Sequence, residues 1–364
     1  MKTLIDNSFA SINVAVVGFG LAGKVFHAPL INGVPGLALH TVVSSRPQEV
    51  RKDWPGVRIQ ATLDLALADP DVHLVVVATS NTSHHALARA ALLAGKHVVV
   101  DKPCTVTLAE TEDLLALARK QGLTLTVFQN RRWDADFQIL KTVVASGALG
   151  RLTHVESHFD RFRLVVPGRW RDELIPGSGL WPDLGPHLAD QALQLFGVPD
   201  DLMLDLASQR DQGQAHDYFH AVLRYESVHP GLRVVLHAGS SVSAAAPRFA
   251  VHGTLGSFVK WGLDGQEDAL KAGARPQIDN LGDWGREPDR GHLSLQTAQG
   301  LVRQPAPDVP GNYFEYYAQL RDHLRGNGPV PVSPEQVWQV MAILERGLQS
   351  AQQGQFVSTA DLRT

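Results

Sequence analysis

Short apolar runs alternate with helical periodicity over the first third of the chain. The pattern predicts buried strands at residues 12–17, 39–44, 72–79 and 97–100. Helices are predicted between them at residues 25–32 and 83–94. A further helix, opened by Thr107 and ended by Gly122, precedes a strand at 124–129. Continuous apolar strands separated by helices are typical of a parallel sheet that is covered on both faces.

The pattern changes after about residue 130, where alternating apolar and polar positions replace the continuous apolar runs. Strands are predicted at residues 153–159, 219–225, 233–238 and 249–253. Residues 262–311 are rich in Gly, Pro and Asp and are interpreted as long irregular loops. Helices are predicted at about 313–325 and after Ser333, where Ser333-Pro334-Glu335-Gln336 has the pattern of a capping box.

These patterns predict two domains. Residues 1–130 are expected to form a Rossmann domain of the α/β class, with a doubly wound parallel sheet. Residues 131–364 are expected to form an α+β domain with a mainly antiparallel sheet.

Composition narrows the class of protein. Lys and Arg number 33 and Asp and Glu number 37 in 364 residues, a net charge of −4, which argues against a nucleic-acid partner. Cys104 is the only cysteine, so neither an intrachain disulfide nor a multi-cysteine metal site can form. No apolar run of 18 residues predicts a membrane span, and the first residues lack the apolar core of a signal peptide. A cytoplasmic location is therefore predicted.

The strongest local signal is Gly18-Phe19-Gly20-Leu21-Ala22-Gly23, which directly follows a predicted strand and opens a helix. In this pattern Gly18 permits the tight turn, Gly20 lets the backbone approach a pyrophosphate, and Gly23 allows close helix–strand packing. The free N–H groups of the helix N-terminus then face the phosphates. The motif predicts a dinucleotide site that includes Phe19; a purely structural turn is the alternative.

The end of the second strand predicts which dinucleotide binds. An NAD site usually has Asp or Glu there to bind the ribose 2′-OH, whereas this chain has Ser45 and Arg46. A hydroxyl and a guanidinium suit a 2′-phosphate, so NADP is predicted. A solvated arginine is the alternative, and NAD stays possible because Glu49 or Asp53 could lie near the ribose.

Two further polar segments end predicted strands, where ligands of parallel sheets bind. Thr79, Asn81 and His84 follow the third strand and are candidates for cofactor contacts, although this segment could simply cap the next helix. Lys102, in Asp101-Lys102-Pro103, follows the fourth strand. It is a candidate for cofactor binding and for polarising a carbonyl or binding a hydroxyl, unless it is merely solvated.

Asp183, His187 and Asp190 have a spacing that places them on one face of a helix. Asp183 and His187 are candidates for catalysis and substrate binding. The alternatives are an N-cap for Asp183 and a buried structural role for His187. A metal site is disfavoured because no second histidine has ligand spacing, so no metal is predicted.

Other histidines stand isolated in the sequence and are interpreted as structural: His27, His216, His220, His237, His252 and His292. Arg131 and Trp133 follow a strand near the predicted domain boundary. They either bind substrate or join the domains.

Together these motifs resemble the glucose–fructose oxidoreductase / inositol dehydrogenase (Gfo/Idh/MocA) family over nearly the whole chain. Thr79–His84 is similar to the family's Thr-Pro-x-x-x-His segment, with Ser80 in place of Pro. Asp101-Lys102-Pro103 is similar to its Glu-Lys-Pro motif, with Asp in place of Glu. Asp183 and His187 match its Asp-x-x-x-His.

Three segments resemble a subgroup that includes NADP-dependent scyllo-inositol dehydrogenase: residues 130–134, 159–162 and 262–268. Asp160, in the second segment, is accordingly a candidate substrate-binding residue alongside Arg131 and Trp133. The resemblance also implies that the second domain has an open sheet that supports a homo-oligomer, a dimer or a tetramer.

The resulting hypothesis is an NADP-dependent oxidoreductase that transfers hydride between the nicotinamide and a secondary alcohol or ketone of a polyol, inositol or sugar. His187, oriented by Asp183, is the expected base, and Lys102 is expected to stabilise the developing alkoxide. The division of proton transfer between Lys102 and His187 stays open. The alternatives are a reductase of another carbonyl, imine or biliverdin-type substrate, and a non-catalytic NADP-binding sensor.

Overall fold

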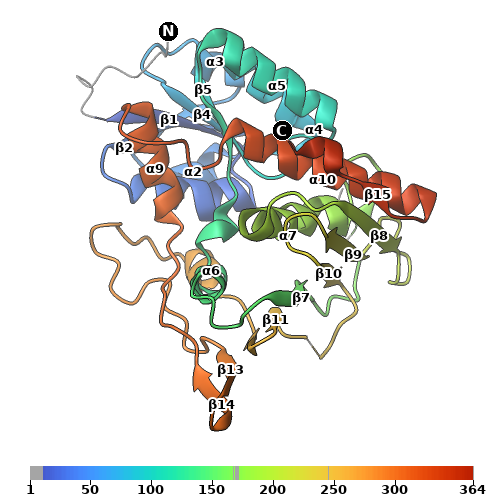
Figure 1. Cartoon of the computed structure of the whole chain (residues 1–364). Helices are drawn as coiled ribbons and strands as arrows, with labels where there is room; N and C mark the ends of the chain where they lie inside the picture. Colours follow the sequence, from blue (N-terminus) through green and yellow to red (C-terminus); the bar gives the residue numbers. More distant parts are fainter. Residues whose placement is uncertain (1–10, 167, 169–171, 245, 364) are drawn as a thin grey trace. The chain divides into compact units, whose positions relative to one another are not determined.

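The computed structural model describes residues 11–166, 168, 172–244 and 246–363. The chain forms two compact units (Figure 1). The first contains the N-terminal segment up to Asn130 together with 265–284 and 312–338, and the second contains 131–264, 285–311 and 339–364. The sequence predicted one boundary, at residue 130. The chain also returns twice to the first unit after that point, which apolar periodicity alone does not reveal.

The first unit contains a six-stranded parallel sheet in the order β3-β2-β1-β4-β5-β6. Its strands are β1 (Ile12–Val17), β2 (Leu37–Val43), β3 (Arg58–Gln60), β4 (Leu74–Val77), β5 (His97–Val100) and β6 (Leu125–Val127). Every residue of β4 and β5 is buried, as expected for central strands of a sheet covered on both faces. The order reverses between β1 and β4, and ligands of such sheets bind at this point, outside the carboxyl ends of the strands.

Helices connect these strands in the first unit. They are η1 (Ala22–His27, a π-helix), α1 (Ala28–Asn32), α2 (Pro47–Asp53), α3 (Leu63–Leu67), α4 (Asn81–Leu93) and α5 (Leu108–Gln121). The predicted start and end of α5 are confirmed, because Thr107 and Glu110 form a capping box and Gly122 adopts the left-handed conformation. The later segments add α8 (Gln266–Lys271) and α9 (Phe314–Leu324).

The second unit contains a nine-stranded sheet in the order β14-β13-β12-β11-β7-β10-β9-β8-β15. Neighbouring strands are antiparallel except for β7 and β10, which are parallel. The strands are β7 (Leu152–His158), β8 (Asp201–Ala207), β9 (Tyr218–Tyr225), β10 (Leu232–Gly239), β11 (Phe249–Gly253), β12 (Gly256–Lys260), β13 (His292–Thr297), β14 (Gly300–Pro305) and β15 (Val357–Ser358). This sheet confirms the predicted α+β class with a mainly antiparallel sheet.

Helix α7 (Leu180–Phe196) packs on β9 and β10 in the second unit. Trp181 anchors it: the indole lies edge-on to Phe219, with ring centroids 5.0 Å apart, and Nε1 donates to the carbonyl oxygen of Leu344 at 3.1 Å. The remaining helices are η2 (Asn130–Trp133), α6 (Ala135–Ala145), α10 (Pro334–Gln353) and η4 (Ala360–Leu362). Ser333 and Gln336 form the capping box predicted at the start of α10.

The expectation of irregular loops over 262–311 is wrong in part, because α8, β13 and β14 lie there. The side chains of β14 are mostly exposed, so that hairpin has almost no apolar periodicity to reveal it. Polar composition likewise concealed α2 and β3 in the first unit.

Candidate active site

The glycine loop after β1 has backbone geometry that excludes side chains. Gly18 has φ +96°, and a Cβ there would lie 2.5 Å from the carbonyl oxygen of Ala78. A Cβ at Gly23 would lie 2.0 Å from the carbonyl oxygen of Gly18. Glycine is therefore required at Gly18 by conformation and at both positions by close packing.

The middle glycine is different, because a Cβ at Gly20 would meet no atom of the described residues within 4 Å. The backbone there borders open space, and the amide of Lys24 donates to the carbonyl oxygen of Gly20 at 2.9 Å as η1 begins. A strand, a glycine turn and the start of a helix at the switch point fit the pyrophosphate of a dinucleotide.

Arg46, three residues after β2 and at the N-cap position of α2, reaches back to this loop. Its Nη2 donates to the carbonyl oxygen of Phe19 at 2.8 Å, while Nη1 lies 3.4 Å from Oε2 of Glu49. The backbone amide of Arg46 donates to Oγ of Ser44 at 3.0 Å. Glu49 and Asp53 are the two acids for which NAD was kept as an alternative cofactor. Glu49 forms an ion pair with Arg46, whereas Asp53 forms one with Lys24 at 2.9 Å. A guanidinium thus lies beside the glycine loop, and Ser45 next to it is exposed.

The segments after β4 and β5 are tied together by His84. One ring nitrogen lies 3.0 Å from the carbonyl oxygen of Pro103 and the other 3.3 Å from that of Thr79. Burial lowers the pKa of His84, which is only 1% exposed. Asn81 is buried in the first turn of α4, and Oγ1 of Thr79 is hydrogen-bonded to Oγ of Ser83 at 2.7 Å. Cofactor contacts of Thr79, Asn81 and His84 stay a prediction.

Lys102 lies at the carboxyl end of β5 and is partly buried. Its backbone amide donates to Oδ1 of Asp101 at 2.9 Å, and that oxygen lies 3.9 Å from Nε2 of His27. Burial lowers the pKa of His27 to about 4, so the imidazole is neutral near pH 7. Nδ1 of His27 is hydrogen-bonded to the hydroxyl of Tyr317 at 2.6 Å. This buried network supports the strand end that carries Lys102.

In the second unit, α7 carries the predicted Asp183–His187–Asp190 stripe. The helix begins at Leu180, after Gly179 with φ +88°, so Asp183 lies inside the first turn and is not the N-cap. Asp183 is partly buried, and His187 is 5% exposed. Asp190 accepts from Arg132 at 2.6 and 2.8 Å, so its carboxylate is occupied by a buried ion pair.

The other substrate-binding candidates have different surroundings. Nη1 of Arg131 donates to Asp134 at 3.0 Å, and its guanidinium lies 4.9 Å from the centroid of the Phe159 ring. Asp160 forms ion pairs with two histidines, described below. Trp133 is partly exposed at the end of η2. Substrate contacts of Arg131, Trp133 and Asp160 stay a prediction.

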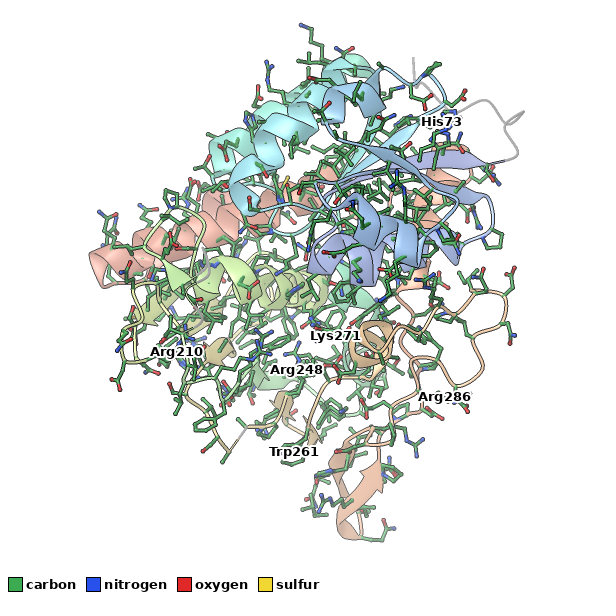
Figure 2. All side chains as sticks on the ribbon, turned by 180° about the vertical axis from the view of Figure 1, so that it is seen from behind. His73, Arg210, Arg248, Trp261, Lys271 and Arg286 are labelled. Carbon is green, nitrogen blue, oxygen red and sulfur yellow. The ribbon has the colours of Figure 1, made fainter. Side chains whose placement is uncertain are left out.

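Sequence reasoning missed Arg248, which is labelled in Figure 2 and is 4% exposed. Its guanidinium donates to Asp136 at 3.1 Å, Ser157 at 2.6 Å and Gln191 at 2.7 Å. Burial lowers the pKa of Arg248, and the charge of Asp136 opposes this effect. These partners are distant in sequence: Asp136 lies on α6, Ser157 on β7 and Gln191 on α7, and only the tertiary packing brings them to Arg248, directly before β11. We interpret the network as a structural support for α7.

The sheet order and the glycine loop define a dinucleotide-binding protein of the Rossmann type. Residues 12–129 match the family described as "Oxidoreductase family, NAD-binding Rossmann fold", and residues 141–359 match its "C-terminal alpha/beta domain". The chain therefore belongs to the Gfo/Idh/MocA family and is an oxidoreductase, as the resemblance predicted.

Several known proteins are similar to this chain over most of its length. The uncharacterised oxidoreductase YdgJ of Escherichia coli is 48% identical over 342 residues, covering 94% of this chain and 96% of its own. The scyllo-inositol 2-dehydrogenase (NADP(+)) IolW of Bacillus subtilis is 36% identical over 345 residues, covering 94% of each chain. The solved structure of YPO2259 from Yersinia pestis has a TM-score of 0.90 at 48% identity, covering 96% of this chain and 97% of the other.

Within the described residues, each helix is too short or too polar to cross a membrane.

Proposed function

We propose that the protein is an NADP-dependent dehydrogenase that oxidises a secondary alcohol of a polyol, an inositol or a sugar, or reduces the corresponding ketone. The observation that supports this proposal most strongly is the strand order of the first unit, in which β1, β4 and β5 are neighbours. Their carboxyl ends bring Gly18, Thr79 and Lys102 to one edge of the sheet. A dinucleotide cradle and a lysine at the same edge suit hydride transfer assisted by a cation.

NADP is proposed over NAD because of Arg46. A carboxylate that reads a ribose 2′-OH would repel a 2′-phosphate, whereas a guanidinium forms charge-assisted hydrogen bonds with it. Arg46 lies against the carbonyl of Phe19 and is about half exposed, so it has access to a ligand on the loop. The name of the relative IolW, an NADP(+) enzyme, supports the same choice.

Bound NADP supplies the hydride acceptor for oxidation, and its reduced form supplies the donor for the reverse reaction. Loss of hydride from a carbinol carbon must be accompanied by loss of the hydroxyl proton. We assign the acceptance of this proton to His187, which Asp183 orients from the preceding turn of α7. The Lys102 ammonium donates a hydrogen bond to the substrate oxygen as negative charge develops, and it can return a proton during reduction.

The substrate class rests on IolW, whose name specifies scyllo-inositol. Inositols and sugars present several hydroxyl groups, so further polar or ring contacts are needed to select one of them. The side chains of Trp133 and Asp183 are both of intermediate exposure, and we propose them for these contacts. Arg131 and Asp160 remain candidates only if they can serve substrate as well as their partners in the chain.

We also propose that the protein forms a homo-oligomer, either a dimer or a tetramer, and that it is located in the cytoplasm. The family resemblance supports the first, and the single, buried cysteine supports the second. Light scattering at low protein concentration tests the first, and a monomer would contradict it.

The proposed activity is tested by following NADP reduction with a panel of inositols, polyols and aldoses, and NADPH oxidation with ketones, aldehydes and cyclic imines. We expect turnover with a cyclic polyol or sugar and its loss in Lys102→Met. Turnover of only an imine, or of biliverdin added to the NADPH panel, would identify a different reductase. Tight NADP binding without turnover of any compound would favour the sensor and contradict the proposal.

A further inference from the structure

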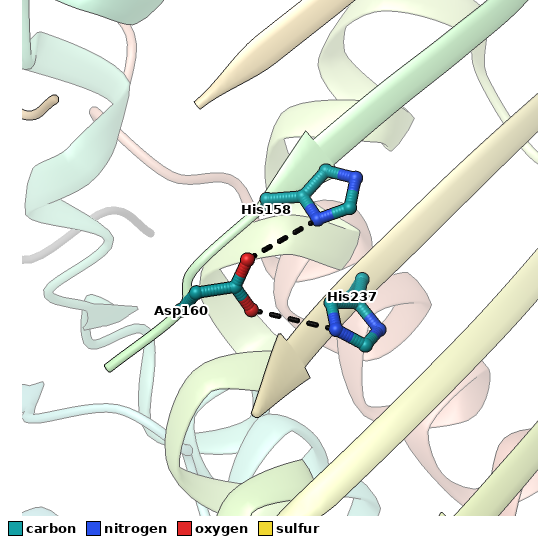
Figure 3. A group of neighbouring side chains, drawn as sticks. All are labelled: His158, Asp160 and His237. Atoms are coloured by element: carbon teal, nitrogen blue, oxygen red, sulfur yellow. Dashed lines mark ion pairs between the residues drawn. The ribbon is translucent and has the colours of Figure 1, made fainter. Parts of the chain in front are cut away.

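A stripe of titratable side chains follows β7 in the second unit. Because side chains alternate along a strand, His154, Glu156 and His158 share one face, and Asp160 continues the stripe beyond the end of β7. β10 runs parallel to β7, and the register pairs His237 with His158. Figure 3 shows the result: Asp160 lies between the imidazoles of His158 and His237.

The three side chains point their ligand atoms at a common centre. Oδ2 of Asp160 lies 3.4 Å from Nδ1 of His158, and Oδ1 lies 3.4 Å from Nε2 of His237. All three ligand atoms lie within 4.8 Å of one another. Atoms bound to one tetrahedral Zn²⁺ at about 2.0–2.2 Å are about 3.3–3.6 Å apart. The two nitrogen–oxygen separations, which involve different oxygens of Asp160, match this range, and no pair of ligand atoms is more than 4.8 Å apart.

The surroundings of His158 also suit a metal ligand. Its Nε2 lies 2.9 Å from Oε2 of Glu156, which leaves Nδ1 facing the centre. A carboxylate on the far nitrogen is the usual partner of a metal-binding histidine, because it fixes the ring and increases its basicity. Nδ1 of His158 is buried and has no hydrogen bond to any described residue. A bound cation would satisfy this nitrogen.

Asp160 is held in place from the backbone as well. The amide of Gly239, at the end of β10, donates to Oδ1 of Asp160 at 3.2 Å. The Asp160 side chain is 3% exposed, and those of His158 and His237 are 14% and 15% exposed. The carboxylate is thus almost fully removed from water, yet an ion can enter beside the two imidazoles.

We propose that His158, Asp160 and His237 bind a divalent transition-metal ion, with Zn²⁺ as the reference ion. Two imidazoles and one carboxylate favour such ions over Ca²⁺ and Mg²⁺, which prefer oxygen ligands. Three protein ligands leave a coordination position for water or another ligand. The ion would cross-link the ends of β7 and β10. This site is separate from the α7 stripe, for which no metal is predicted, and it does not depend on the proposed reaction.

The alternative is a network held by protons alone. Burial lowers the pKa of His158, but the interactions of the imidazole with the carboxylates of Asp160 and Glu156 outweigh burial, so the pKa lies above its ordinary value. Burial lowers the pKa of His237, with the charge of Asp160 opposing. One imidazolium beside Asp160 would also satisfy the cluster, and metal titration distinguishes the two.

The test uses full-length protein without an affinity tag, stripped with a chelator and titrated with Zn²⁺ by calorimetry and with Co²⁺ by visible absorption. We expect one tight ion per chain and cobalt bands that include histidine coordination. His237→Gln should weaken binding by more than about 100-fold, since even loss of an outer partner costs about 10–100-fold. Glu156→Gln, which removes such an outer partner, should weaken Zn²⁺ binding by about 10–100-fold. His252→Gln is the matched control, because its imidazole is on the same sheet, bound to Ser257.

Thermal unfolding gives a second measurement that does not depend on activity. An ion that binds only the folded protein raises the Tm. Zn²⁺ should raise the Tm of the wild type and of His252→Gln, but not that of His237→Gln, with circular dichroism showing that each variant is folded. Failure of the wild type to bind Zn²⁺, or equal binding and equal Tm shifts in His237→Gln, would overturn the proposal.

Discussion

Arg46 is the side chain that we propose selects NADP over NAD. Its guanidinium contacts the carbonyl of Phe19 and pairs with Glu49, at the strand end where an NAD enzyme usually has an acid. The charge is about half exposed and lies next to Ser45, which is exposed. Position and chemistry therefore both support the proposed binding of a 2′-phosphate.

Arg46→Ala should weaken NADP binding by about 1–3 kcal/mol, the range for a hydrogen bond to a charged group, and change NAD binding little. Calorimetric titration with both cofactors measures this. Arg51→Ala is the control, because Arg51 is an exposed arginine on α2, the helix that directly follows Arg46. Equal NADP affinity before and after the Arg46 substitution would show that Arg46 is not the phosphate ligand.

His27 makes the stability of the protein depend on pH. Burial lowers its pKa to about 4, whereas in the unfolded chain the value is about 6.5. Between these values the unfolded chain binds a proton that the folded chain does not, so stability falls as pH falls from 6.5 to 4. The shift corresponds to about 3 kcal/mol.

We therefore expect His27→Gln, which can keep a hydrogen bond to Tyr317, to lose part of this pH dependence. Urea unfolding of both proteins at pH 8 and pH 5 measures this dependence. The difference in unfolding free energy at pH 8 reports the contacts that the substitution removes. The destabilisation caused by the substitution should be smaller at pH 5. An equal difference at both pH values would contradict the assignment.

At the scale of elements, helix α7 depends on a buried ion pair. Asp190 accepts two hydrogen bonds from Arg132, and the two side chains are 2% and 8% exposed. The pair ties α7, and with it Asp183 and His187, to the turn η2. The helix is positioned by charge as well as by the packing of Trp181.

Asp190→Asn should lower the free energy of unfolding of the second unit by about 3–5 kcal/mol, because it leaves the Arg132 guanidinium buried without a carboxylate. The matched control is Asp361→Asn, whose pair with Arg346 is exposed and should contribute less than about 1 kcal/mol. Urea unfolding compares the two. Similar losses in both variants would show that the buried pair does not fix α7.

Local signals predicted much of the first unit and little of the polar architecture of the second. The glycine loop, β1, β5 and α5 depend on residues adjacent in sequence, so their patterns were sufficient. The partners of Arg248 and the pairing of His158 with His237 depend on strand register between distant segments. His237 was interpreted as an isolated histidine, and only the parallel pairing of β7 and β10 brings it to His158.

At the scale of the whole molecule, the proposed reaction requires residues from both units. Lys102 follows β5 in the first unit, and His187 lies on α7 in the second. They are 85 positions apart in the sequence, and the proposed function assigns both to one hydride transfer. Two groups that act as a unit give strongly non-additive effects when both are removed.

The shared role of Lys102 and His187 is tested most directly by the kcat of Lys102→Met, His187→Ala and the double variant with the best alcohol of the substrate panel. We expect each single variant to lose roughly 10²–10⁴-fold, typical of a general acid–base group, and the double variant to lose much less than the product. The NADP affinity of His187→Ala should stay nearly unchanged, and Lys120→Met, which changes an exposed lysine on α5, should keep the wild-type kcat. Single losses that multiply in the double variant, or a His187→Ala variant as active as the wild type, would contradict the shared role of Lys102 and His187.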